Sequence, residues 1–326
     1  MVGWRCVMPR EMVETVTGPI AASELGFTLS HEHVIVGFPG VKQTYPELMD
    51  WEGIESGGIE MLSEARAEGL GTIMDATPFE LGRDVEMLRR VSEGSGVNIV
   101  ASTGTYVDIP RLIWFTHPDR MAAVYVREIT EGIEGTGIKA GMIKVADNNY
   151  ELSDAEVMVL RAASRASNET GIPITTHTQP LNKVGEPQWR IFAEEGVDPA
   201  RVCIGHSSDA TDFEYLANLA REGVFLGMDE LPGHQLNEPW RDKAAMVMRL
   251  LDAGFERNLM LSHDWSVKRH PDDSWGASEE KHRQVNPDGY AFVGRRFLPY
   301  LREMAVGEEA ITLMTVDNPR RFLTGE

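Results

Sequence analysis

The sequence predicts a (β/α)8 barrel, a closed ring of eight parallel strands surrounded by helices. Eight short apolar runs rich in β-branched residues recur along the 326 residues, which is typical of strands buried on both faces of a parallel sheet. Most segments between them carry apolar residues at three- and four-residue spacing, which indicates helices. Successive strands lie mostly about 20–40 residues apart, the length that a right-handed βα unit needs.

The predicted elements follow one another with clear boundaries. The helix between the fourth and fifth strands begins with Ser153 and Glu156, a capping box, and ends at Gly171. The segment of about residues 11–25 predicts a short β-hairpin that caps the bottom of the barrel, and residues 1–326 are expected to form a single domain. An open doubly wound sheet is disfavoured, because no glycine-rich phosphate fingerprint follows the first strand. The predicted strands are 26–34, 71–77, 98–106, 141–147, 172–178, 201–207, 223–229 and 258–264.

Composition and charge exclude several classes of partner. The chain has 31 basic and 51 acidic residues and a net charge of −20, so we expect neither a nucleic acid nor a membrane surface as partner. No apolar run reaches the ~18 residues of a membrane span. Two distant cysteines, Cys6 and Cys203, form no disulfide framework, and the N-terminus lacks an apolar signal region. A cytoplasmic location is therefore expected.

Potential metal ligands gather at the ends of the predicted strands. In SHEHV, His31 and His33 are two residues apart, so a strand would aim both imidazoles to the same side. Strand ends also carry His177, His206 and Asp264, and Lys144 lies within the fourth strand. Because barrel chemistry is built at the carboxyl ends of the strands, this pattern predicts a metal site there. Single strand-end histidines would more often be structural, but so many on one rim favour the metal interpretation.

Lys144 is the unusual member of this set. Burial among cations lowers the pKa of a lysine, and a neutral amine can add CO2 to give a carbamate, a carboxylate on a long arm. Such a group would provide one oxygen ligand to each of two metal ions. The alternative is an unmodified lysine paired with Asp147 or another acid.

The combined pattern resembles the phosphotriesterase family of the amidohydrolase superfamily, specifically its phosphotriesterase-like lactonase branch. The motifs are HEH on the first strand, lysine on the fourth, histidine on the fifth and sixth, and SHD on the eighth. TGPIAASELGFTLSHEHV, EGIEGTGIKAGMIKVA and AEEGVDPARVCIGHSSD are similar to family segments, so the resemblance covers nearly the whole chain. Deaminase-like relatives lack the fourth-strand lysine, so Lys144 argues against a mononuclear deaminase.

The resemblance implies a site for two divalent metal ions. His31, His33 and Asp264 would hold the more buried ion and His177 and His206 the more exposed one, while carbamylated Lys144 and a hydroxide bridge both. The hydroxide would act as nucleophile, and Asp264 would take its proton and pass it toward the leaving group. Zinc is the expected metal, and manganese, cobalt or iron also suit such ligands.

Two residues bear on the substrate. Lactonase-like members carry a tyrosine after the third strand, and Tyr106 matches it; its hydroxyl would donate to a substrate oxygen, and the alternative is an aromatic rim residue. The same relatives have arginine after the aspartate that ends the seventh strand, where this chain has Glu230. The exchange of a cation for a carboxylate disfavours an anionic substrate at that place.

The long loop after the eighth strand adds further candidates. Trp265 is expected to line the substrate pocket, and Trp275 to cover it. His263 should face the other side of its strand in a structural role. Glu32 is expected to face away from the site and make packing or ion-pair contacts.

The leading hypothesis is a metal-dependent hydrolase of lactones or related carboxylic esters, with promiscuous hydrolysis of phosphotriesters. A dedicated hydrolase of aryl dialkyl phosphates is the alternative. A non-catalytic binding protein on a relic barrel is disfavoured, because all six ligand positions are present. The resemblance also implies a homodimer packed away from the active face.

Overall fold

The computed structural model describes residues 10–233, 240–269 and 283–326. Within these residues, eight parallel strands form the central sheet, in the order β3-β5-β6-β7-β8-β9-β10-β11, which is also their order along the chain. The prediction of a (β/α)8 barrel is confirmed. The strands are β3 (Phe27–Glu32), β5 (Leu70–Asp75), β6 (Asn98–Thr105), β7 (Met142–Ala146), β8 (Ile174–His177), β9 (Val202–Ile204), β10 (Phe225–Met228) and β11 (Leu259–Leu261).

The first and last strands close the barrel through hydrogen bonds near their carboxyl ends. The amide of His31 donates to Ser262 Oγ over 2.9 Å, and the amide of Asp264 donates to the carbonyl of His31 over 3.1 Å. Because all strands run in one direction, their carboxyl ends lie on one rim. Residues more than 200 positions apart therefore meet at the top of the barrel.

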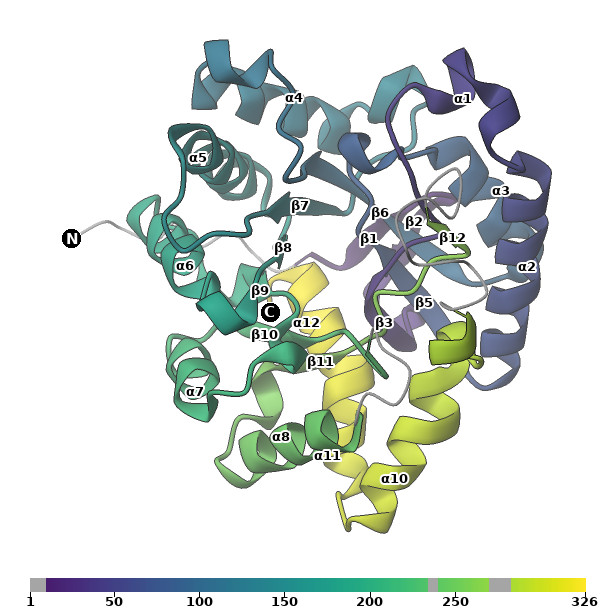
Figure 1. Cartoon of the computed structure of the whole chain (residues 1–326), viewed down its shortest axis with the longest axis vertical. Coiled ribbons are helices and arrows are strands. Elements are labelled where there is room, and N and C mark those ends of the chain that lie inside the picture. The colour runs from purple at the N-terminus through teal and green to yellow at the C-terminus, as the bar shows by residue number, and fades with distance from the viewer. Residues whose placement is uncertain (1–9, 234–239, 270–282) are drawn as a thin grey trace.

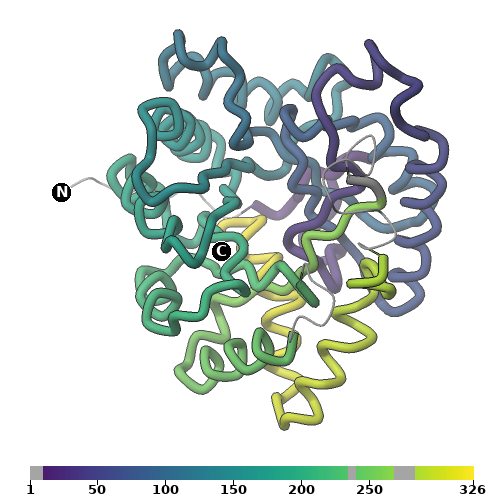
Figure 2. The backbone as a smooth tube through the Cα atoms, viewed as in Figure 1, coloured from purple at the N-terminus to yellow at the C-terminus, as the bar shows by residue number. Residues whose placement is uncertain are grey.

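Helices surround the strands on all sides, as Figure 1 shows, and the tube in Figure 2 follows the repeated strand-to-helix path. The longer helices bury an apolar stripe on their inner side, because their apolar residues recur at helical spacing. Alongside the short α1 (Val41–Thr44), the ring holds α2 (Trp51–Ala67), α3 (Val85–Ser95), α4 (Pro118–Thr130), α5 (Asp154–Thr170), α6 (Gly185–Glu194), α7 (Phe213–Arg221), α8 (Trp240–Asp252), α10 (Leu298–Glu303), α11 (Glu308–Thr312) and α12 (Asn318–Thr324).

Helix α5 shows how the local sequence sets these boundaries. The side chain of Ser153 accepts a hydrogen bond from the amide of Glu156, and the carboxylate of Glu156 accepts one from the amide of Ser153. Gly171 ends the helix with φ 74°, a left-handed conformation that glycine adopts without strain. The predicted capping box and terminal glycine are confirmed.

A small apolar cluster fills the bottom of the barrel. Met74, Val100 and Met142 alternate with strand residues that face the helices, so they point inward. The hairpin of β1 (Met12–Thr15) and β2 (Gly18–Ala21) and the last helix close this end, with Val13 and Phe322 packed in the same cluster. This packing leaves the polar strand ends at the opposite rim as the accessible part of the barrel interior.

Two strands end earlier than predicted. Strand β9 stops at Ile204 and β11 at Leu261, whereas the predicted strands continued to 207 and 264. His206 and Asp264 adopt left-handed backbone conformations, with φ 57° and 54°, which no strand residue can have. The chain therefore turns at these two residues instead of continuing the ladder.

Across residues 10–233, 240–269 and 283–326, no helix is long and apolar enough to cross a membrane.

Candidate metal centre

The six predicted metal ligands come from five strands and meet at the carboxyl rim. His31 lies in β3, Lys144 in β7 and His177 at the end of β8. His206 and Asp264 follow β9 and β11, where the left-handed turns bring their side chains to the barrel mouth. A non-glycine residue in this conformation costs roughly 1–2 kcal/mol. Such strain at two residues of one cluster is typical of a functional site.

One half of the cluster contains His31, His33, Lys144 and Asp264. His33 Nε2 lies 3.0 Å from Asp264 Oδ1, and His31 Nε2 lies 3.8 Å from the same oxygen. Lys144 Nζ lies 2.7 Å from His31 Nε2, and its side chain is fully buried. Asp147, the alternative partner for this lysine, instead accepts a hydrogen bond from Gln188 Nε2 over 2.7 Å.

The other half contains His177 and His206. Their ring nitrogens, His177 Nδ1 and His206 Nε2, are 2.7 Å apart. The ring of His206 also stacks on that of His31, with centroids 4.9 Å apart, so the two halves are in contact. The structure therefore brings all six residues into one cluster, with Lys144 and His31 between the outer pairs.

The outward-facing nitrogen of each histidine has a partner of its own. Nδ1 of His31 and Nδ1 of His206 face the carboxylate of Asp229, at 2.8 and 3.2 Å. His33 Nδ1 contacts Thr77 Oγ1 at 2.8 Å, and His177 Nε2 contacts Asn148 Oδ1 at 3.0 Å. A ring nitrogen beside a carboxylate or amide oxygen carries the proton, and a hydroxyl such as that of Thr77 can accept it as well, so the inner nitrogen of each ring, when neutral, is available as a ligand.

The inner nitrogens face one another or a carboxylate oxygen, and this arrangement fits a metal ion. His177 Nδ1 meets His206 Nε2, and His33 Nε2 meets a carboxylate oxygen of Asp264. Lone pairs at such distances repel each other unless a proton or a cation lies between them. Histidine ligands of metals ordinarily donate their other N–H to an oxygen, and an oxygen lies beside the outer nitrogen of all four rings here. The donor set of imidazole nitrogen and carboxylate oxygen suits zinc and similar divalent ions.

Burial and neighbouring charges shift the pKa values in the cluster. Burial lowers the pKa of Lys144 to about 8, although Asp264 and Asp229 oppose the shift. Burial and the lysine charge lower the pKa of His31 to about 4. At His206, burial is outweighed by the carboxylates of Glu230 and Asp229, which raise its pKa to about 9. A fraction of Lys144 is therefore neutral near pH 7–8, the state in which its amine can react with CO2.

Asp229 is the main residue of the site that sequence reasoning missed. It follows β10, is fully buried, and contacts His31 and both the amide and the ring of His206. Burial would raise its pKa, but the two histidines lower it to about 2, so this carboxylate stays ionised. Its position at the end of a predicted strand was the available signal. An aspartate whose partners come from other strands gives no ligand spacing in the sequence.

The predicted substrate residues occupy different surroundings. The hydroxyl of Tyr106 lies 3.4 Å from His177 Nδ1. Glu230 Oε1 lies 3.4 Å from His206 Nδ1, and this carboxylate also lies close to Asp264. Trp265 is only 3% exposed and packs in the hydrophobic core, so a role in substrate contact stays a prediction. Trp275 lies outside the described residues.

Glu32 and His263 form a buried contact on the other side of the strands. Glu32 Oε1 accepts hydrogen bonds from the amide of His263 and from Ser262 Oγ, and it lies 2.6 Å from His263 Nδ1. His263 Nε2 accepts a hydrogen bond from the amide of Val293. The expected structural role of His263 is confirmed. Through these hydrogen bonds, Glu32 connects β3 to the segment after β11.

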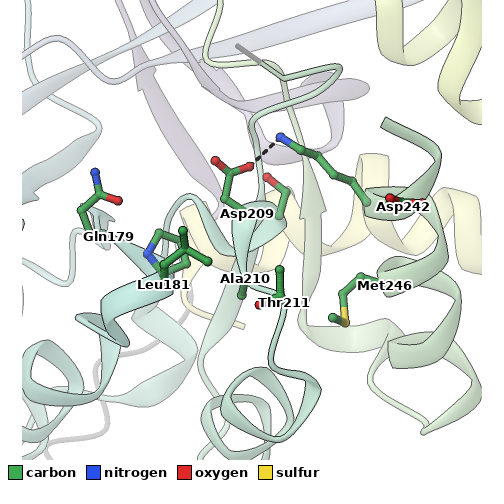
Figure 3. A pocket seen from close by; sticks show the side chains of 10 residues that line it. Gln179, Leu181, Asp209, Ala210, Thr211, Asp242 and Met246 are labelled. Carbon is green, nitrogen blue, oxygen red and sulfur yellow. Dashed lines mark hydrogen bonds and ion pairs between the residues drawn. The ribbon is translucent and has the colours of Figure 1, made fainter. Parts of the chain in front are cut away.

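A cavity of about 490 Å³ lies between the loops after β8 and β9 and the start of α8 (Figure 3). Lys243 Nζ donates to Asp209 Oδ1 over 2.5 Å and to the carbonyl of Glu230 over 2.7 Å. Burial and the neighbouring carboxyl of Glu230 raise the pKa of Asp209 to about 7. The cavity is lined by Gln179, Pro180, Leu181, Ser208, Asp209, Ala210, Thr211, Asp242, Lys243 and Met246.

Comparison with known proteins gives a match over nearly the full length. A model described as the phosphotriesterase family matches residues 11–323. A phosphotriesterase homology protein of Mycobacterium tuberculosis is 38% identical, with 95% of this chain and 97% of that protein covered. An aryldialkylphosphatase of Saccharolobus solfataricus is 32% identical (94% and 97% covered), and an N-acetyltaurine hydrolase of Xenopus tropicalis is 26% identical (96% and 97%).

Proposed function

This chain belongs to the phosphotriesterase family, and on that premise we propose that it is a metal-dependent hydrolase of lactones or related carboxylic esters. The observation that carries the proposal is the cluster itself. Four imidazole nitrogens, the carboxylate of Asp264 and the amine of Lys144 converge at the barrel rim, and the outer nitrogen of each ring faces an oxygen acceptor.

The cluster offers ligands for two divalent ions, with zinc as the expected metal. His31, His33 and Asp264 would hold one ion, His177 and His206 the other, and Lys144, as a CO2-derived carbamate, would contact both. When bound, such ions polarise the substrate oxygen and lower the pKa of water.

Asp264 is the proposed proton carrier. In the reaction, a water oxygen forms a bond to the carbonyl carbon, and the bond from that carbon to the leaving oxygen breaks. The carboxylate of Asp264 would accept the proton that water releases and deliver it to the leaving oxygen. Its side chain is 13% exposed, whereas the side chain of its neighbour His31 is 1% exposed, so Asp264 is the more accessible of the two.

Tyr106 and Glu230 would select and orient the substrate. The tyrosine hydroxyl, 3.4 Å from His177 Nδ1, would donate a hydrogen bond to the carbonyl oxygen or to the leaving alkoxide. Glu230 adds a carboxylate beside His206, which repels an anionic substrate group and favours a neutral ester.

The names of the relatives support a second candidate function. The Saccharolobus solfataricus relative is named an aryldialkylphosphatase, which favours phosphotriesters as the alternative substrate class. A tetrahedral carbonyl adduct resembles a phosphotriester in shape, so one site can act on both. The relative from Xenopus tropicalis is named a hydrolase of N-acetyltaurine, an anionic amide, and Glu230 disfavours an anion.

A comparison of kcat/KM on one metal-loaded preparation tests the proposal. The substrates are a medium-chain γ- or δ-lactone, an aryl dialkyl phosphate, and N-acetyltaurine. We expect the lactone value to be higher than the phosphotriester value by about 100-fold, which corresponds to roughly 2.7 kcal/mol of transition-state preference.

The other outcomes are equally informative. A preference for the phosphotriester would make this chain a dedicated organophosphate hydrolase and overturn the lactonase proposal. Turnover of N-acetyltaurine above both would show that Glu230 does not exclude anions. Protein that binds no metal after supplementation would favour a non-catalytic barrel.

A further inference from the structure

Glu80 is a buried carboxylate that the proposed mechanism does not use. It lies in the short helix Phe79–Leu81, in the loop after β5, and is 6% exposed. Its Oε2 accepts a hydrogen bond from the backbone amide of Tyr106 over 3.1 Å. We propose that Glu80 is a positioning residue, whose carboxylate holds the backbone of Tyr106 so that the tyrosine hydroxyl lies at the metal centre.

Tyr106 is the first residue beyond the anchored part of its strand. Strand β6 ends at Thr105, whose hydroxyl is hydrogen-bonded to the buried hydroxyl of Tyr125 at 2.7 Å. In the loop that follows, Val107 is half-buried and Asp108 is exposed, and the next fully buried side chain is that of Ile113, seven residues after Tyr106. A segment with few buried contacts at its start is held there mainly by its hydrogen bonds. The hydrogen bond from the Tyr106 amide to Glu80 holds the backbone just beyond the point where the strand ends.

The ring of Tyr106 connects this anchor to the site. Its centroid lies 5.3 Å from that of His177, in an edge-to-face arrangement with an angle of 71°. Its hydroxyl lies 3.4 Å from His177 Nδ1, the nitrogen that faces His206. A shift of the Tyr106 backbone would therefore move the hydroxyl relative to a proposed metal ligand. Through this contact, the loop after β5 influences the geometry at the end of β8.

Burying the carboxylate of Glu80 costs free energy, which its hydrogen bond offsets in part. Burial raises the pKa of Glu80 to about 7, and the carboxylate of Glu128 adds to the effect. The nearby cation Arg83 is already paired with Glu128 at 2.9 Å and with Glu134 at 3.1 Å. An apolar side chain of the same length would pack here at lower cost, but it could not accept the amide hydrogen of Tyr106.

Two substitutions of nearly equal volume isolate this hydrogen bond. Glu80→Gln keeps an acceptor oxygen, and Glu80→Met fills the space without one. The first readout is hydrogen exchange at the Tyr106 amide, which does not depend on catalysis. We expect exchange to accelerate about tenfold in E80M and to stay close to wild type in E80Q. Glu47→Ala, an exposed glutamate in another loop of the same rim, is the control and should change nothing.

The second readout rests on the proposed function and uses the preferred substrate. We expect E80M to lower kcat about tenfold with a smaller change in KM, and E80Q to stay near wild type. In the double variant, E80M should add nothing to the effect of Tyr106→Phe. Unchanged amide exchange in E80M, or effects of E80M and Y106F that multiply, would overturn the proposal. If no substrate is turned over, the exchange result still decides the positioning role, so the two failures are distinguishable.

Discussion

At the residue scale, the outward-facing nitrogens of the histidines determine what the inward-facing ones do. Asp229 contacts Nδ1 of both His31 and His206, and its low pKa keeps it an acceptor at neutral pH. Both rings then present Nε2 to the centre of the cluster. One carboxylate therefore sets the orientation and the tautomer of ligands from two different strands.

Replacing this carboxylate should weaken metal binding. Asp229→Asn has the same shape but places an amide group against three N–H groups, the rings of His31 and His206 and the His206 amide, so one ring must turn or change its tautomer. We expect metal affinity to fall about 10- to 100-fold, as measured by competition with a chelating dye. Asp242→Asn, an exposed carboxylate at the start of α8, is the control. Unchanged affinity in D229N would show that packing alone orients the rings.

Asp264 is expected to behave differently, because its proposed role is proton transfer. In Asp264→Asn, the side chain cannot take up a proton, while the left-handed backbone remains acceptable, since asparagine tolerates this conformation well. We expect turnover to be largely abolished while some metal remains bound, as measured by kcat and by elemental analysis of the same sample. Full activity in D264N would contradict the role.

At the scale of elements, the position at which a strand ends determines where its proposed metal ligands lie. Strands β9 and β11 stop two or three residues before His206 and Asp264, and the positive φ of these residues turns their side chains toward the mouth. The helices that follow the strands act as the rigid frame. Their caps should affect stability more than chemistry.

Helix α5 offers a test of that separation. Ser153→Ala removes the side chain that accepts from the amide of Glu156 and should lower the free energy of unfolding by about 1 kcal/mol. kcat/KM should remain at the wild-type value. Urea unfolding and steady-state kinetics measure the two quantities. Ser63→Ala, at an exposed position inside α2, is the matched control and should be neutral or slightly stabilising. A tenfold loss of activity in S153A would link α5 to the site.

At the scale of the whole molecule, an apolar plug below and a polar cluster above divide the barrel interior. The lower cluster, with Met74, Val100 and Phe322, keeps water from reaching the site through the bottom. The upper cluster packs imidazole nitrogens against one another and against the carboxylate of Asp264, an arrangement that a bound metal ion would hold together. The fold is therefore expected to depend on the metal for part of its stability. A homodimer and a cytoplasmic location remain predictions.

Removal of the metal should lower the melting temperature. Ligand bound at 100 times its Kd stabilises a protein by about 2.7 kcal/mol, which for a large domain corresponds to about 5 °C or more. We expect a shift of this size after treatment with EDTA and recovery after zinc is added back, by scanning calorimetry. EDTA already saturated with calcium is the control. An unchanged melting temperature in protein shown to have lost its metal would contradict this.

The sequence by itself determined the fold class and the set of candidate ligands. Eight apolar runs at regular spacing predict the barrel, because a strand buried on both faces has apolar side chains at consecutive positions. His31 and His33 signal a site for the same reason, since alternation along a strand is local. Lys144 lies within a predicted strand and His177, His206 and Asp264 near strand ends, and the barrel topology brings these positions together.

Only the tertiary structure decided how these groups act on one another. Asp229, Thr77 and Asn148 orient the ligand rings from other strands or loops, and Glu80 reaches Tyr106 from the neighbouring loop. The burial of Trp265 in the hydrophobic core depends on groups far away in the sequence. A periodic pattern in the sequence predicts which face of a strand or helix a residue lies on. The hydrogen-bond partner of that residue comes from another segment, so no local spacing predicts it.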